Sequence, residues 1–479
     1  MKNNFFFFLL ISLSTHSLAF TQNKKSKIAT IMKTYHSYNM FDGAVLVAEN
    51  GKILYKGAFG KANREWNINN TVDTKFMIGS ISKPITAYLT LIQTQKGLID
   101  INKTIEDYLP EFKNKPAAKV TIKQLMSNTS GMPNYDIIKD FFPKYSRQNY
   151  NREEYVKIYI DSALLFEPGS KYFYSSWGFF TLAHILERVT GRSFAQLQKE
   201  DIFDKLQMTN TASYHHTQIV TKRAQGYDYA FGGFTSGDFR DQSNTMGAGD
   251  LYSTVADMFK LHLGIQNNTL LNQQLTYEML TPGLPPVKYG YGWFNRNFKY
   301  TDTDSVAANF HLGMMEGFIS FYFRIPETNS FAIILCNSSP TDFFGIIKNL
   351  IKVLYNKPVL IKQPIQKKME KLIAEVGSGK AIQTYQQLKL DTANYYIDWI
   401  SMNFIAEQLL QLKRYEDARI ISENNVAEFP NKDLIQYTMG NIYLALNRKE
   451  EAINAYNKAL AVNPDYIEVK NKLKELENK

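Results

Sequence analysis

The stretch Phe76–Pro84 places a serine and a lysine three positions apart, directly before a mostly apolar run. In a helix, residues i and i+3 share one face, so the Ser80 hydroxyl and the Lys83 amine can touch. Pro84 is tolerated only in the first helical turn, which predicts a helix beginning near Ser80. The apolar residues that follow predict that this helix is buried. The chain must therefore fold so that a polar pair lies at the buried start of a helix.

Ser80 and Lys83 have the chemistry of a nucleophile and its base. A serine hydroxyl becomes a good nucleophile only when a neighbouring group removes its proton. A lysine amine can do so once burial or nearby positive charge has lowered its pKa. The free N–H groups at a helix start also favour a developing anion. Ser-x-x-Lys sequences occur by chance as well, so the interpretation depends on other segments of the chain.

A second polar segment, Tyr174-Ser175-Ser176, follows a Pro-Gly loop and opens a predicted helix. A tyrosine phenol close to a lysine amine can pass a proton from the nucleophile to a leaving group. Ser176 could hydrogen-bond the lysine or the substrate. Taken alone, however, a tyrosine in an aromatic-rich loop is most often a packing residue.

A third segment runs from His311 to Phe318 on the strand side of the predicted fold. His311 could hydrogen-bond the tyrosine or the lysine, or hold a substrate carboxylate when it is charged. Gly313 would let a substrate approach the backbone. The N–H of Met314, with that of Ser80, could form an oxyanion hole. A single histidine in a strand is usually structural, so this segment too depends on its neighbours.

Together the three segments resemble the motifs of serine β-lactamases and penicillin-binding proteins, which read Ser-x-x-Lys, Tyr-x-Asn and Lys- or His-x-Gly. The most similar branch is the class C β-lactamase-related hydrolases, which include D-aminopeptidases, DD-peptidases and esterases. The resemblance covers about residues 25–360, and it implies that Ser80 is acylated, Lys83 is its base and Tyr174 is the proton shuttle. Supporting matches are Asp42–Gly57, Val120–Pro133, Phe166–Gly169, Tyr289–Trp293 and Gly317-Phe318.

Two positions depart from that pattern. Ser176 stands where the family has the Asn of Tyr-x-Asn, which removes an amide that often meets a substrate amide. Leu312 stands where Lys-Thr-Gly has its Thr, and a leucine cannot hydrogen-bond a carboxylate. Both departures weigh against efficient β-lactam hydrolysis. Lys288-Tyr289-Gly290 also resembles the third motif, but it belongs to the Tyr-Gly-x-Gly-Trp segment.

The predicted fold is mixed α/β (α+β) and β-lactamase-like, with an antiparallel sheet, flanking helices and a helical subdomain. Asn50-Gly51 between two apolar runs predicts a hairpin near the amino terminus. Strand patterns return over 289–294, 307–312, 318–325 and 331–335, with helical patterns between. Strands at both ends predict one sheet assembled from the two ends of the 25–360 domain. Residues 226–249 predict a long loop that either walls a cleft or is disordered.

From residue 380 to 479 the sequence repeats itself. Leu412, Ala418 and Pro430 recur as Leu446, Ala452 and Pro464, each 34 positions later. This period, with small residues where helices cross, is typical of tetratricopeptide repeats; the alternative is an amphipathic helical tail of no particular family. We interpret residues 381–388 as a degenerate earlier half-repeat. So few repeats predict docking onto the larger domain or a protein partner.

Residues 1–19 are typical of a secretory signal: Lys2, an apolar core over 5–13, and Ser17-Leu18-Ala19 before a mature start near Phe20. An uncleaved membrane anchor is the alternative. We therefore expect an exported, periplasmic or secreted protein with no integral membrane span after signal removal. The single cysteine, Cys336, excludes an intrachain disulfide and is predicted to be buried in a strand.

The formal net charge of +10 fits an anionic envelope or an acidic substrate. No basic-aromatic motif indicates nucleic acid, no cofactor is implied, and His215-His216 lacks the spacing of a metal site. The sequence therefore predicts a serine hydrolase that forms an acyl-enzyme with small esters, amides or D-amino-acid peptides. The alternatives are a true β-lactamase or DD-peptidase, and an inert hydrolase-like domain whose repeats bind a protein.

Overall fold

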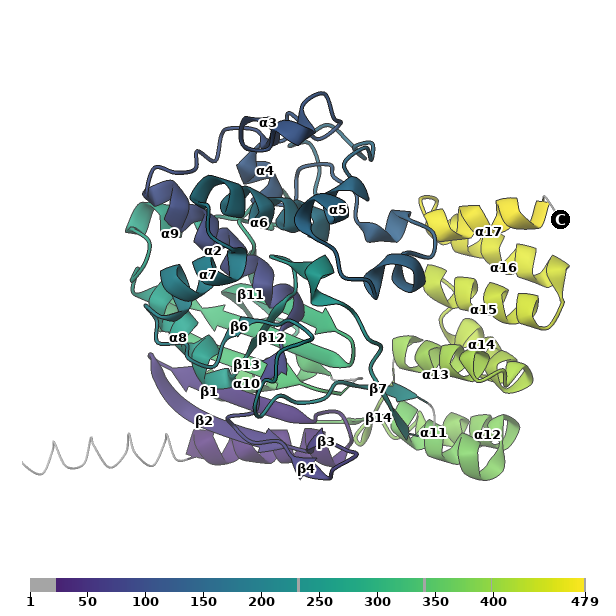
Figure 1. Cartoon of the computed structure of the whole chain (residues 1–479). Coiled ribbons are helices and arrows are strands. Elements are labelled where there is room, and N and C mark those ends of the chain that lie inside the picture. Colours follow the sequence, from purple (N-terminus) through teal and green to yellow (C-terminus); the bar gives the residue numbers. More distant parts are fainter. Residues whose placement is uncertain (1–22, 231–232, 339–341, 398, 478–479) are drawn as a thin grey trace, which may run out of the picture. The chain divides into compact units, whose positions relative to one another are not determined.

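The computed structural model describes residues 23–230, 233–338, 342–397 and 399–477 (Figure 1). The predicted signal segment 1–19 lies outside these ranges. The chain divides into two compact units: residues 1–228 with 236–359, and residues 229–235 with 360–479. Within the described ranges, every helix is too short or too polar to cross a lipid bilayer.

The first unit is built on a six-stranded antiparallel sheet in the order β10-β11-β12-β13-β1-β2. The amino-terminal hairpin joins the carboxy-terminal strands because β1 pairs with β13, with Gly43 opposite Cys336. The prediction of one sheet assembled from both ends of the domain is confirmed. The strands are β1 Gly43–Glu49, β2 Lys52–Phe59, β10 Phe294–Lys299, β11 Ser305–Met315, β12 Phe318–Ile325 and β13 Ser330–Cys336.

Strand β12 is buried along its whole length, which indicates that both faces of the sheet are covered. On one face Phe321 packs against Phe343 of α10 (Phe343–Leu354), with ring centroids 5.5 Å apart. On the other face Tyr322 packs against Trp293, 5.1 Å apart. Helix α8 (Val255–Gln266) packs on β13 and β1. Cys336 is buried in β13, as predicted.

Helix α2 (Ser82–Gln95) is the central helix of this unit, and its residues from Ser82 to Gln93 are all buried. A helix that is covered on every side has to lie inside the domain. It packs against α6 (Ser176–Thr190), which Ser175 caps at its start and Gly191 ends with a left-handed φ of 67°. The predicted helical subdomain is confirmed.

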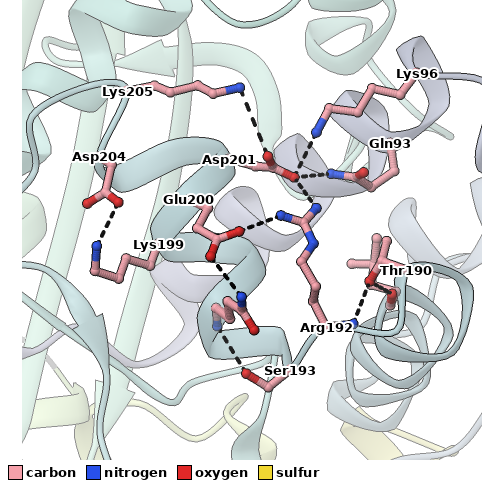
Figure 2. Close-up of polar contacts among 12 residues, drawn as sticks. Gln93, Lys96, Thr190, Arg192, Ser193, Lys199, Glu200, Asp201, Asp204 and Lys205 are labelled. Atoms are coloured by element: carbon pink, nitrogen blue, oxygen red, sulfur yellow. Dashed lines mark hydrogen bonds and ion pairs between the residues drawn. The ribbon is translucent and has the colours of Figure 1, made fainter.

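Asp201 joins the carboxy-terminal end of α2 to the segment that follows α6 (Figure 2). Its buried carboxylate accepts hydrogen bonds from Arg192 at 2.9 Å and Gln93 at 2.8 Å, and pairs with Lys96 at 2.8 Å. Three donors around one buried carboxylate compensate for its loss of hydration. This cluster therefore holds the far end of α2 in place.

One sequence-based boundary was wrong. The predicted strand 289–294 begins only at Phe294, because Gly292 has a left-handed φ of 78° that interrupts extended backbone. Helix α7 (Phe194–Gln198) continues as a wider π-helical turn over Lys199–Phe203. Further elements are β3 Lys61–Asn63, β4 Ile68–Asn69, β5 Phe76–Met77, η1 Gly79–Ile81, α3 Ile105–Tyr108, α4 Ile122–Met126, α5 Arg152–Lys157, β6 Ala212–Ser213, β7 Tyr227–Ala230, β8 Gly233–Ser236, β9 Leu251–Ser253 and α9 Gln273–Leu280.

The second unit is helical and shows the 34-residue period directly. Helices α13 and α15 begin at Trp399 and Asp433, and α14 and α16 begin at Tyr415 and Lys449. Ala418 and Ala452 are fully buried at matching positions, where small side chains let helices approach closely. The helices are α11 Ile365–Val376, α12 Ser378–Leu388, α13 Trp399–Gln411, α14 Tyr415–Glu428, α15 Asp433–Ala445, α16 Lys449–Val462 and α17 Ile467–Glu477.

A short piece of the middle of the chain, residues 229–235, belongs to this helical unit. The Tyr229 hydroxyl donates to the Glu370 carboxylate at 2.7 Å, and the Lys367 amine lies 3.3 Å from the centroid of the Tyr229 ring. The Gln408 side-chain amide donates to the Tyr229 carbonyl at 2.7 Å. Tyr229 thus anchors this segment among α11 and α13.

We expect Tyr229→Phe to lower the free energy of unfolding of the helical unit by about 1–2 kcal/mol, because a hydrogen bond to a carboxylate is lost. Tyr229→Ala should cost about 1–2 kcal/mol more, since the contact with the Lys367 amine also disappears. Urea unfolding of the full chain, followed by helical circular dichroism, measures both values. Tyr277→Ala, at a tyrosine that is 70% exposed, is the control. Equal transitions for wild type and Tyr229→Ala would contradict the anchor.

Candidate active site

Ser80 lies in a tight turn that connects a strand to the buried helix α2. β5 pairs with β9, and the 3₁₀ turn η1 leads directly into α2 at Ser82. The predicted helix therefore starts two residues after Ser80, and Ser80 occupies the turn before it. Ser80 is partly exposed while Lys83 is fully buried. The hydroxyl can thus meet a substrate while the amine stays away from water.

Strand β11 presses closely on this turn. Gly79 has a φ of 50°, and a Cβ there would lie 2.8 Å from the Met314 nitrogen and 2.7 Å from its carbonyl oxygen. The Ser320 hydroxyl donates to the Ile78 carbonyl at 2.7 Å. The backbone of Met314 therefore lies beside the turn that carries Ser80, while its side chain is 61% exposed.

The Lys83 amine has the surroundings of a neutral base. Its Nζ lies 3.0 Å from Ser80 Oγ and donates to the Ala248 carbonyl at 2.9 Å. Burial, together with the positive charge of Arg240, lowers the pKa of Lys83 well below its ordinary value. No carboxylate is among the described groups that bond it. An amine in this setting is favoured in the form that accepts a proton.

Tyr174 completes the group around Ser80. The Lys83 Nζ lies 4.6 Å from the centroid of the Tyr174 ring, and the Tyr174 phenol hydrogen-bonds Ser80. Burial raises the pKa of Tyr174, and the hydrogen bond with Ser80 only partly opposes this. The phenol is therefore protonated and available as a proton donor. The structure brings the predicted Ser80, Lys83 and Tyr174 together.

The segment 128–134, part of the predicted Val120–Pro133 match, positions Tyr174. Asn128 accepts the Phe173 N–H at its carbonyl, 2.9 Å away, and the Ser175 N–H at its Oδ1, 3.0 Å away. The Ser175 hydroxyl donates to the Pro133 carbonyl at 2.8 Å. Sequence reasoning did not single out Asn128, although it lies in the polar turn cluster that ends α4.

Ser176 does not bond Lys83, contrary to one of its two expected roles. Its backbone N–H donates to Asn134 Oδ1 at 3.0 Å, because Ser176 is the first residue of α6 and its N–H has no helical partner. The partners of the Lys83 amine are Ser80 and the carbonyl of Ala248 instead. The Ala248 carbonyl was also missed, although the 226–249 segment was predicted as a possible cleft wall.

The surroundings of His311 do not favour the charged form that the expected role as a holder of a carboxylate requires. Its Nδ1 donates to the Leu312 carbonyl at 2.7 Å, and its Nε2 accepts from the Tyr289 hydroxyl at 3.0 Å. Burial, with the Lys83 charge, lowers the pKa of His311 to about 3. Its tyrosine partner is Tyr289, from the predicted Tyr289–Trp293 match, and the His311 ring centroid lies 6.2 Å from that of Tyr174.

Gly313 was expected to let a substrate approach the backbone, but the structure explains this glycine by a contact within the protein. A Cβ at this position would lie 1.9 Å from the Ile78 carbonyl oxygen and 2.3 Å from Ser320 Oγ. The space beside Gly313 is therefore filled by the protein's own turn before Ser80, and substrate access is not its reason. Glycine is required here because β11 must approach that turn closely.

Known proteins resemble this chain in sequence and in fold. The family model described as Beta-lactamase matches residues 25–356, and a Tetratricopeptide repeat model matches residues 434–466. Penicillin-binding protein 4* of Bacillus subtilis (strain 168) is 26% identical over 379 residues, which are 74% of this chain and 82% of that protein. Teichoic acid D-alanine hydrolase of Staphylococcus aureus is 32% identical over 267 residues, which are 54% of this chain and 64% of that protein.

The chain thus spans less than two thirds of the length of the D-alanine hydrolase. The crystal structure of FmtA from Staphylococcus aureus superposes with a TM-score of 0.60 at 27% identity, covering 71% of this chain and 93% of that one.

A buried lysine beside a serine on an α/β scaffold defines a class of serine hydrolase sites. The chain belongs to the beta-lactamase family, as a hydrolase domain with a carboxy-terminal tetratricopeptide repeat.

The lowered pKa of Lys83 predicts how activity depends on pH. Only the neutral amine can accept the Ser80 proton, so acylation should fall as pH drops through the folded pKa of Lys83 and level off above it. Arg240→Gln removes a charge that lowers this pKa, so the rise should move to higher pH. Pre-steady-state acylation by an activated ester, measured across pH, checks both statements. A rise at the same pH in both proteins would contradict the electrostatic link.

Gly313→Ala should lower the free energy of unfolding by at least about 2 kcal/mol, because the new methyl group meets the Ile78 carbonyl. It should also slow acylation, since the turn that carries Ser80 has to shift. Gly379→Ala in α12 is the matched control, because nothing lies within 4 Å of its added Cβ. Thermal unfolding and ester hydrolysis are the measurements. Unchanged stability in Gly313→Ala would show that β11 does not press on the turn.

Proposed function

We propose that this protein is an exported serine hydrolase that forms an acyl-enzyme on Ser80 with small esters, amides or D-amino-acid peptides and releases it with water. The observation that carries the proposal is the buried Lys83 Nζ, 3.0 Å from Ser80 Oγ. Support also comes from the proteins that this chain resembles, which include a penicillin-binding protein and a teichoic acid D-alanine hydrolase. Export rests on the predicted signal segment 1–19.

In the first step, neutral Lys83 accepts the Ser80 proton as Ser80 Oγ attacks the substrate carbonyl carbon. Negative charge then develops on the carbonyl oxygen. The backbone N–H groups of Ser80 and Met314 are the proposed donors to it, since the Met314 backbone lies beside the turn. The C–O or C–N bond then breaks, and the leaving group takes a proton from Tyr174.

Tyr174 suits this transfer because its phenol hydrogen-bonds Ser80 and lies over the Lys83 amine. The proton held by Lys83 can return to Tyr174 and restore its neutral phenol. Water then attacks the acyl-Ser80 ester, with the same groups acting in reverse order. Products are a free acid and an alcohol or amine, so atoms balance without a cofactor.

The repeat region supports a second, non-catalytic activity of the same chain. One repeat matches the tetratricopeptide model, and the helix pairs α13–α14 and α15–α16 follow the 34-residue period. Stacked helix pairs of this kind present extended surfaces that bind proteins. We propose that the helical unit binds a protein partner while the first unit carries the chemistry.

Ser80→Ala should reduce the hydrolysis of p-nitrophenyl esters by at least about 10³-fold, because the nucleophile is lost. It should also abolish the mass shift that the wild-type protein shows with D-alanyl esters, D-Ala-D-Ala peptides or β-lactams. Intact-protein mass spectrometry across this panel identifies the acyl group. Nitrocefin turnover would indicate a β-lactamase, and a long-lived penicillin adduct would indicate a DD-peptidase.

Ser82→Ala is the control, because this neighbouring hydroxyl donates to the Gly79 carbonyl at 2.8 Å, whereas the Lys83 amine bonds Ser80 and the Ala248 carbonyl. It should keep the mass shift and lose only about 1 kcal/mol of stability. A folded Ser80→Ala protein that hydrolyses activated esters at the wild-type rate would show that the assignment of Ser80 is wrong.

A further inference from the structure

Arg240 is a second cation close to the reacting pair, and no step of the proposed reaction uses it. It lies in the segment that returns from residue 235 to the first unit. Its side chain is 9% exposed. Its positive charge lowers the pKa of Lys83. The contacts place it on the same side of the turn: Arg240 Nη1 lies 4.0 Å from Glu316 Oε1, and Glu316 is two residues after Met314, whose backbone lies beside the turn that carries Ser80. A substrate bound at Ser80 can therefore extend toward the guanidinium.

Two aromatic rings support the guanidinium. The Arg240 Cζ lies 5.1 Å from the centroid of Tyr135 and 5.5 Å from that of Phe142. Arginine stacked in this way keeps its N–H groups free at the edge of its plane, where a carboxylate or phosphate binds in bidentate geometry. The buried Arg240 Nε has no hydrogen-bond partner among the described residues. A buried donor of this kind needs an acceptor.

The carboxylate that faces Arg240 neutralises it only weakly. Glu316 Oε1 lies 4.0 Å from Arg240 Nη1, which is beyond hydrogen-bond distance. Burial raises the pKa of Glu316 to about 7; Asp228 and Asp238 add to this rise and Arg240 opposes it. Asp238 also pairs with Arg147 at 3.3 Å. Near neutral pH, Glu316 therefore leaves much of the Arg240 charge uncompensated.

Two groups that hold substrate in the family are also missing from this chain, since Leu312 and Ser176 stand where the family motifs have a Thr and an Asn. We propose that Arg240 binds an oxyanion of the substrate, so that this enzyme acts on acyl esters or amides that carry a carboxylate or a phosphodiester. This inference rests on the proposed function, because it needs a substrate acylating Ser80. It names a substrate class and a specificity-determining residue for that reaction.

The geometry also gives the substrate preference a pH dependence. A charged Glu316 competes with the substrate anion for Arg240, whereas a protonated Glu316 does not. The preference for anionic substrates should therefore decline as pH rises through about 7. Arg240, Asp228 and Asp238 are the charged groups that act on Glu316, and Arg147 pairs with Asp238. Of these, Arg240 is the one in contact with the proposed anion.

The test compares three p-nitrophenyl-type or D-alanyl esters that differ in one group: neutral, carboxylate-bearing and glycerol-phosphodiester-bearing. The readout is the ratio of kcat/KM for each anionic ester to that for the neutral ester at about pH 6, where Glu316 does not compete for Arg240. All three esters need the same neutral Lys83, so its protonation cancels in the ratio. In Arg240→Gln this ratio should fall about 10- to 100-fold, as expected for a lost charge-assisted hydrogen bond. Arg240→Lys should give an intermediate ratio, because lysine keeps the positive charge but cannot bind an oxyanion in bidentate geometry.

The two anionic esters separate the sources of the oxyanion, since the one whose ratio falls more identifies the natural group. Arg296→Gln is the matched control, because Arg296 also lies over two rings, Phe294 and Phe310, at 5.4 and 5.5 Å. Its ratio should stay at the wild-type value. A ratio that is unchanged for both anionic esters in folded Arg240→Gln would overturn the inference.

If Arg240→Gln does not fold, Glu316→Gln provides the test. Its ratio at about pH 8 should rise to the value that the wild type has at about pH 6, since the competing charge is gone. Identical ratios in both proteins at both pH values would overturn the inference. The proposed function fails separately: it is wrong if Ser80→Ala still hydrolyses the neutral ester, whatever the ratios are.

Discussion

The structure depends on the burial of one lysine amine next to one serine hydroxyl. An ammonium group without a carboxylate is costly inside a protein, and the cost falls when the amine loses its proton. Lys83 is fully buried and contacts the Ser80 hydroxyl and the Ala248 carbonyl. The domain therefore favours the neutral form of Lys83, which is the form that could accept the Ser80 proton in the proposed reaction.

The segments around this pair are held in place largely by close contacts between backbones. Gly79 and Gly313 let β11 approach the turn that carries Ser80, and Ser320 ties the two together through the Ile78 carbonyl. Backbone groups of Asn128 and Pro133 hold the segment that carries Tyr174. Groups positioned by secondary structure move little, so the hydroxyl, the amine and the phenol keep a reactive geometry without a bound substrate.

The polar residues near the site divide by charge. His311 is neutral because it is buried and both ring nitrogens are used, which leaves positive charge to Lys83 when protonated and to Arg240. Glu316 lies near Arg240 but is too far away for a hydrogen bond. A site with a permanent guanidinium and a weak counter-ion favours anionic molecules. This physical property follows from packing, and it is the basis of the proposal that the site binds an acidic substrate although Leu312 stands where the family has a threonine.

The sequence by itself determined the local features: the Ser80–Lys83 spacing, the Asn50-Gly51 hairpin and the 34-residue repeat. These depend on helical or strand periodicity and on turn chemistry, which act over a few residues. It also allowed Tyr174 to be grouped with Ser80 through a family resemblance. Only the tertiary structure decided the partners of His311, the reason for Gly313, the contact of the Ala248 carbonyl with Lys83 and the surroundings of Arg240. Those depend on contacts between residues far apart in the chain, which periodicity does not encode.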